Sequence, residues 1–170
     1  MAKRLFQASN FTPTATADTT AMANATYMAI KGGSTTQRID VLDFMISGLA
    51  PSTSSPTILQ FARHSTVATT PTALAAPNSD GPIDPASAAL AAPPVTFVAA
   101  GTGGQRSATT SDARLNLAFN AQGGLLRYNS APSQQFVILG NTANFGEASL
   151  SAFTGGTVGA ISAHIEYEPY

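Results

Sequence analysis

The chain contains no cysteine and no tryptophan, and only 10% of its 170 residues are charged. An average soluble domain has about a quarter of its residues charged. Without cysteine, disulfides, thiolate metal sites and thiol catalysis are excluded. The net charge of -1 argues against a general nucleic-acid binder, because such a protein needs a basic face that displaces counterions.

Long apolar runs are also missing. Lys3 and Arg4 resemble the start of a signal peptide, but residues 5–18, which follow them, are rich in polar side chains. The longest apolar region, residues 86–100, is mostly alanine and is interrupted by Pro93 and Pro94. A membrane helix needs about 20 unbroken apolar residues. We therefore expect a soluble protein with no membrane partner.

Small residues dominate what is present. Alanine, threonine and serine make up roughly two-fifths of the chain, which also contains 14 glycines and 11 prolines. Nine phenylalanines, four tyrosines and runs of valine, isoleucine and leucine nevertheless provide a core, which a disordered chain would lack. A single domain of this length buries roughly 68–70% of its unfolded surface, so it can fold without disulfides.

Short runs of alternating apolar and polar residues predict β-strands. In the last run, Ile161, Ala163, Ile165 and Tyr167 are expected to face inward. The strand-like runs cover residues 26–31, 37–47, 57–67, 95–100, 114–120, 125–129, 135–140 and 159–167. Residues 145–153 fit either a strand or a turn of helix. The pattern predicts an all-β protein, an antiparallel β-sandwich or jelly roll of about eight strands.

The run 37–47 is apolar almost throughout. This continuity predicts a strand covered on both faces, or a strand with a bulge near Leu42. Asp40 and Asp43 lie three apart in the same strand-like run, so we expect them on opposite faces.

Two segments differ from the strand pattern. Residues 1–25 are predicted to form an extended N-terminal arm, and residues 26–170 a single β-sandwich domain; a first strand over residues 4–9 followed by a loop is a compatible alternative. Residues 68–94 form a Pro/Ala-rich loop that carries six of the eleven prolines. Within it, Asp84 as N-cap and Pro85 at the first position predict a short helix that ends before Pro93. A connection of this length is usually functional, most often as an interaction surface; a plain surface excursion is the alternative.

Catalytic and metal-binding motifs are not recognisable. His64 and His164 belong to no metal-ligand spacing, so hydrogen-bonded or solvated histidines are expected. Glu166 and Glu168 share a strand face, but without an aromatic cleft they indicate a solvated edge rather than a glycosidase pair. The glycine-rich residues 101–107 lack the lysine of a phosphate-binding loop. We expect no enzyme activity, no cofactor and no metal.

Three blocks of sequence carry a resemblance to a known family. The opening residues 1–11, the block 38–48 and the block 78–97 are similar to tailed-bacteriophage capsid decoration (cement) proteins. The resemblance implies a viral structural protein, made in the bacterial cytoplasm, that binds the major capsid protein on the outside of the virion head. It also implies fastening of neighbouring capsomers and self-association as a homodimer or homotrimer.

The arm and the Pro/Ala-rich loop are the segments best suited to such contacts, because extended chain can reach several subunits. The predicted protein-interface residues are Lys3, Arg4, Leu5, Phe6, Phe11, Asp80, Pro82, Asp84, Pro85 and Leu90. Deletion of residues 2–20 should then abolish capsid binding and leave the fold intact.

Two alternative functions remain at this point. One is a carbohydrate- or receptor-binding β-sandwich of a phage fibre or bacterial surface, for which Tyr128, Tyr167 and Tyr170 are the candidate contact residues. The other is a phage tail-tube or connector component.

Overall fold

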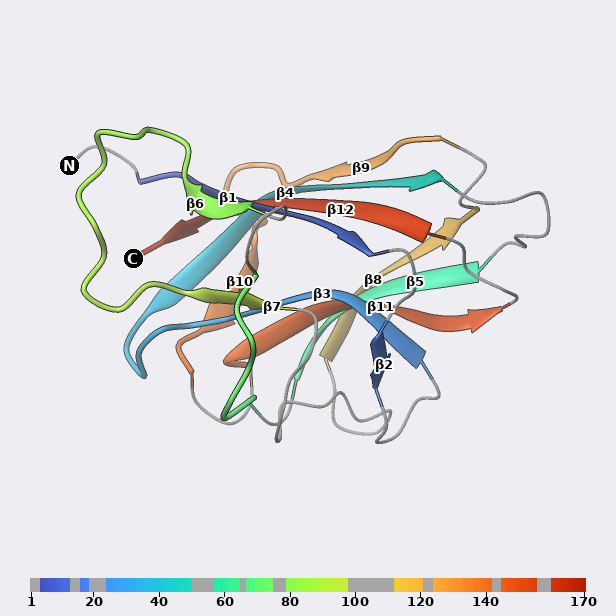
Figure 1. Cartoon of the computed structure of the whole chain (residues 1–170), viewed down its shortest axis with the longest axis horizontal. Coiled ribbons are helices and arrows are strands. Elements are labelled where there is room, and N and C mark those ends of the chain that lie inside the picture. The colour runs from blue at the N-terminus through green and yellow to red at the C-terminus, as the bar shows by residue number, and fades with distance from the viewer. Residues whose placement is uncertain are drawn as a thin grey trace.

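Two antiparallel sheets packed face to face make up the computed structural model (Figure 1). It describes residues 4–12, 16–18, 24–49, 57–64, 67–74, 79–97, 112–120, 124–141, 145–155 and 160–170. Sheet A consists of β1 (Phe6–Thr12), β4 (Arg38–Leu49), β6 (Ser79–Pro82), β9 (Leu126–Asn129), β10 (Phe136–Leu139) and β12 (Ala160–Pro169). Sheet B consists of β2 (Thr16–Asp18), β3 (Asn24–Lys31), β5 (Thr57–Arg63), β7 (Val95–Phe97), β8 (Asp112–Phe119) and β11 (Glu147–Gly155).

The strand order in sheet A is β10-β4-β12-β1-β6, and β9 pairs with the same edge of β4 as β10. The order in sheet B is β2-β3-β11-β5-β8, and β7 also pairs with β3. The last two strands of the chain, β11 and β12, therefore lie in the middle of the two sheets, where each has a partner on both sides.

The predicted all-β class and the antiparallel sandwich are confirmed. Each of the eight strand-like runs contains a strand. Residues 145–153, whose sequence fits either a strand or a turn of helix, supply most of β11. The expected number of strands is wrong, since the described residues form twelve. β1 corresponds to the alternative of a first strand near the N-terminus, and it lies between β12 and β6 rather than outside the sheet.

The predicted short helix after Asp84 is wrong. Residues 84–92 form turns and bends, in which Asp84 Oδ1 accepts a hydrogen bond from Ala86 N at 2.9 Å. Ser87 N also donates to Asp84 O at 3.0 Å, so Asp84 closes a turn instead of starting a helix. A seven-residue alanine-rich stretch has too little apolar surface to pay for helix nucleation. No helix forms in the described residues, and hence none there could cross a membrane.

A bulge at Leu42, one of the two alternatives that the sequence offered, determines which residues of β4 face the core. Glu166 pairs with Asp43, whereas the next residue of β12, Tyr167, pairs with Val41, so Leu42 has no partner across the ladder. The extra residue places Val41 and Phe44 both in the core. Asp40 and Asp43, expected on opposite faces, consequently lie on the same outer face of sheet A. The prediction for these two acids is wrong because it assumed an unbroken two-residue period.

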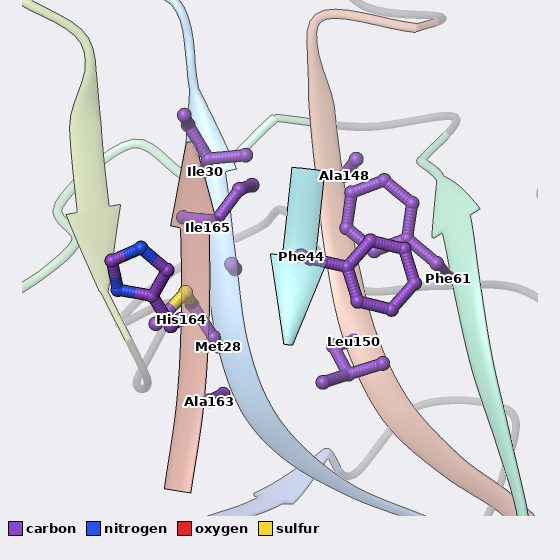
Figure 2. Close-up of a pocket in the computed structure, with 10 residues that line it drawn as sticks. Met28, Ile30, Phe44, Phe61, Ala148, Leu150, Ala163, His164 and Ile165 are labelled. Carbon is purple, nitrogen blue, oxygen red and sulfur yellow. The ribbon is translucent and has the colours of Figure 1, made fainter. Parts of the chain in front are cut away.

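The core lies between the two sheets. Phe44 of sheet A stacks on Phe61 of sheet B with ring centroids 5.3 Å apart. Figure 2 shows these rings and the side chains of Met28, Ile30 and Leu150 converging on one small space. Its volume of about 10 Å³ is at or below what a single water molecule requires. This part of the interior is packed too tightly to hold a ligand.

Core packing predicts the effect of truncating Leu59, which is fully buried. Leu59→Ala should lower the free energy of unfolding by about 2–5 kcal/mol, because it removes buried methyl groups and leaves a cavity. Leu125→Ala is the matched control, since Leu125 is 66% exposed, and it should change stability by no more than about 0.5 kcal/mol. Urea unfolding of the two variants measures both values. Equal stability of the two would contradict the assignment of the core.

Burial of Tyr27 predicts a loss of stability in alkali. Desolvation raises the pKa of this phenol from 10.0 to about 12, whereas the unfolded chain ionises near pH 10. Above pH 10 the unfolded state therefore loses its proton first, and stability falls as the pH rises from 10 to 12. We expect Tyr27→Phe to remove about 2–3 kcal/mol of this fall. Parallel stability profiles of wild type and variant over this range would refute the expectation.

Candidate interaction surface and buried polar network

The two segments predicted to contact partners lie side by side in the structure. β1 pairs with β6 so that Phe6 is opposite Pro82 and Gln7 opposite Gly81. The pairing continues past β6, where Ile83 N donates to Leu5 O at 2.9 Å. We call residues 4–5 and 81–86 the β6 edge. This edge lies at the end of the sandwich where the C-terminus is found (Figure 1).

The β6 edge is built for side-chain contacts more than for strand addition. Because Ile83 directs its N–H toward β1, the alternation along an antiparallel strand directs position 82 away from β1. That position is proline, which has no N–H to offer a neighbouring strand. Ile83 itself is 43% exposed, and a side chain added at Gly81 would meet no atom within 4 Å. The edge thus presents an accessible apolar side chain beside open space.

Among the predicted interface residues, Arg4, Pro82, Asp84 and Pro85 are exposed. Leu5 is half-buried beside them. Lys3 lies outside the described residues.

The four other predicted residues do not share this exposed placement on the β6 edge. Phe6 is buried and stacks on Tyr167 with ring centroids 5.7 Å apart, so its side chain belongs to the core. Leu90 is half-buried and packs against the same core. Phe11 is 49% exposed at the far end of β1, and Asp80 is described only as a member of β6.

The Pro/Ala-rich loop is fastened to the sandwich at its C-terminal end. Gln37 Oε1 accepts a hydrogen bond from Gly33 N at 2.7 Å, and Gln37 Nε2 donates to Ala92 O at 3.1 Å. A Cβ atom at Gly33 would lie only 2.3 Å from Pro93 O. Glycine is therefore required at position 33 for the loop to approach this closely.

A buried polar network fastens the other end of the loop. His64 Nδ1 lies 2.7 Å from Glu147 Oε1, and His64 Nε2 lies 2.7 Å from Ser149 Oγ. The second carboxylate oxygen, Glu147 Oε2, accepts a hydrogen bond from Ala68 N at 2.7 Å. Lys31 Nζ donates to Ala68 O at 2.6 Å. Both backbone groups of Ala68 are thus bound by charged side chains of sheet B.

This network has the connectivity of a serine–histidine–acid relay. Glu147 and Ser149 are completely buried, however, and His64 is 2% exposed. Ser149 Oγ is also within 2.9 Å of Ser151 Oγ, so its hydrogen-bonding capacity is used inside the protein. The arrangement accounts for an anchor that holds residue 68 against the sheet.

Sequence reasoning foresaw a hydrogen-bonded His64 but missed its partners. The available signal was the alternation of Glu147, Ser149 and Ser151, three polar residues on one face of a strand whose other face is apolar. Such a face is ordinarily assigned to solvent. Residues 67–74 and β7 cover it instead, and Ala68 and Phe97 pack there with Ala29 in a small second core.

The outer face of sheet A carries a second set of polar contacts. Asp43 is buried, and its Oδ2 accepts hydrogen bonds from Arg127 Nε at 2.7 Å and from Asn129 Nδ2 at 3.2 Å. His164 Nδ1 lies 2.7 Å from Ser9 Oγ, as expected for a hydrogen-bonded histidine. In the described part of the chain, no group of three or more histidine or acidic side chains is arranged to hold a metal.

Comparisons with known proteins gave no match: no family model, no curated protein and no solved structure is significantly similar to this chain.

The buried network predicts a large effect for a conservative change at Glu147. Glu147→Gln keeps the shape of the side chain but leaves one carbonyl oxygen to serve both His64 and Ala68. We expect a loss of about 1–3 kcal/mol in the free energy of unfolding and faster hydrogen exchange at the Ala68 amide. Glu166→Gln, on the partly exposed outer face of sheet A, is the control and should have little effect. Equal stability and equal Ala68 exchange in both variants would contradict the anchoring role.

Proposed function

We propose that the protein is a structural component of a bacteriophage particle, a decoration protein that binds the major capsid protein on the outside of the head. In this role it stabilises contacts between neighbouring capsomers and acts as a homodimer or homotrimer. The observation that carries the proposal is the β6 edge, where the two segments predicted to meet partners are joined in one exposed strip.

The strand pairing supports a jelly roll as the finer description of the fold. The strands pair as a nested set: β1 with β12, β3 with β11, β4 with β9 and β10, and β5 with β8. A long antiparallel hairpin rolled into two layers has this order, and viral capsid domains are among the proteins that use it.

Weak contacts suffice for a protein of this kind. A head offers many equivalent sites, and subunits that associate with one another bind several sites at once, so modest contacts combine through effective concentration. Ile83, as an exposed apolar side chain flanked by proline, is suited to the centre of such a contact, where charged residues are depleted.

Because β1 is a strand of sheet A, deletion of residues 2–20 is not a clean test of capsid binding. Deletion of residues 2–20 would remove β1, which contributes the buried Phe6 and Ala8 to the core, so loss of binding would follow from unfolding alone. A point substitution at the exposed edge avoids this problem.

The test compares Ile83→Asp with Leu125→Asp, two exposed apolar side chains replaced by the same charge. Each purified variant is mixed with empty heads of the phage that encodes the protein, and occupancy is measured by co-sedimentation and cryo-electron microscopy. We expect Ile83→Asp to lower occupancy at least about tenfold, because a buried unpaired charge costs well over 1.4 kcal/mol, and Leu125→Asp to bind as wild type.

Two results would count against the proposal. Wild-type protein that does not bind the heads at all would overturn it, and binding to tails instead would favour a tail-tube or connector role. Binding that is unchanged in Ile83→Asp would show that the β6 edge is not the contact.

A further inference from the structure

A surface cavity opens beside β9 and β10, at the edge of sheet A that lies farthest from β6. Its volume is about 250 Å³, and its lining residues are Arg63, Tyr128, Gln134, Gln135, Phe136 and Val137. We propose that this cavity binds a single sugar ring of a glycan, a function that goes beyond attachment to a phage head.

The aromatic wall of the cavity is fixed by the core. Tyr128 packs on Phe44 with ring centroids 5.4 Å apart, and Phe136 packs edge-on against Phe61 at 4.6 Å. Phe44 and Phe61 are themselves stacked across the two sheets. The rings at the surface therefore need no reordering when a ligand arrives, and preorganisation of this kind lowers the cost of binding.

Arg63 also lines the cavity. Its guanidinium lies 5.2 Å from the centroid of Phe136 and 4.9 Å from that of Phe145, and its Nη1 donates to Val137 O at 3.1 Å. These contacts hold the guanidinium plane in one orientation. Phe145 is 37% exposed beside it, which adds an accessible aromatic surface next to the cavity.

Backbone strain is concentrated at the same place. In the described residues, Ser133 and Phe145 are the two non-glycine residues with positive φ, at 67° and 74°. Ser133 belongs to the turn that presents Gln134 and Gln135, and Phe145 lies against Arg63. A positive φ at a bulky residue such as phenylalanine is unusual, and such strain gathers at ligand-binding sites.

The chemistry of the lining selects the ligand class. A sugar ring combines an apolar C–H face, which aromatic rings contact, with hydroxyl groups that both donate and accept hydrogen bonds. The side-chain amides of Gln134 and Gln135 also donate and accept. Among the described residues that line the cavity, none carries a carboxylate and Arg63 is the one arginine, which is too little positive charge for a nucleic-acid strand. The volume, just below the usual 300–1,000 Å³ of small-molecule sites, fits one ring rather than a larger ligand.

The test uses the full chain and a panel of free monosaccharides: glucose, galactose, N-acetylglucosamine and glucuronic acid, each at millimolar concentration. Saturation-transfer NMR should detect contact with at least one of them. The double variant Gln134→Ala/Gln135→Ala should weaken that binding about tenfold or more, since each lost hydrogen bond lowers affinity severalfold. Gln7→Ala, on β1 and away from the cavity, is the control and should bind as wild type.

Three outcomes would overturn the proposal. The first is the absence of saturation transfer with every sugar of the panel, and the second is sugar binding that is unchanged in the double variant. The third is a double variant that loses binding to phage heads but not binding to sugar. The last result would show that the cavity receives a side chain of a protein partner. Head binding measured with Ile83→Asp remains a separate readout, so failure of this inference and failure of the proposed function are distinguishable.

Discussion

The bulge at Leu42 is the local feature on which much of the sandwich depends. β4 is the longest strand, and along one edge it pairs first with β10, over residues 38–41, and then with β9, over residues 43–46. Leu42 is the point of change, and its carbonyl accepts hydrogen bonds from both Ser130 N and Ser130 Oγ, each at 2.8 Å. The extra residue keeps the apolar residues on both sides of it in the core. Without it, half of β4 would turn its apolar side chains to the outer face.

The same bulge determines what the outer face and the sheet edge can do. It brings Asp43 onto the outer face, where Arg127 and Asn129 of β9 bind its carboxylate. It also separates β9 from β10, so that residues 130–135 must turn beside Leu42. That turn carries Gln134 and Gln135 to the cavity. The single extra residue in one ladder thus affects which side chains of β4 enter the core, the binding of the buried Asp43 by the exposed Arg127, and the position of the turn at the cavity.

Several of the few charged side chains in this protein are buried. Burial is described for six of the nine acidic residues, and four of these six, Asp40, Asp43, Glu147 and Glu168, are buried. Burial of a carboxylate is unfavourable unless it is hydrogen-bonded. Asp43 and Glu147 have partners in other segments of the chain, whereas Asp40 and Glu168 accept hydrogen bonds from residues two positions away. Glu147 is the clearest case, since it holds the backbone of residue 68 and with it the start of the Pro/Ala-rich loop. This buried acid thus fastens a segment that has little apolar surface of its own.

Sequence patterns predicted what depends on local alternation and missed what depends on tertiary contacts. Ile161, Ala163, Ile165 and Tyr167 are buried as their two-residue period indicates, and Leu42 lies in the expected bulge. β6 was missed because a four-residue strand containing glycine and proline has no strand signature; pairing with β1 alone makes it one. The prediction of a helix after Asp84 was wrong because it relied on a local capping signal, whereas a short helix also needs an apolar face that packs against the rest of the protein.

The strand order separates the two surfaces to which functions are proposed. β10 and β6 are the outermost members of sheet A in the order β10-β4-β12-β1-β6. Four interstrand steps of about 4.8 Å place them roughly 19 Å apart. A partner bound at the β6 edge therefore need not cover the cavity between β10 and Arg63. Because rigid β-strands connect the two edges, a ligand at one would change the other only by altering the whole sandwich, and independent binding at the two surfaces follows from the architecture.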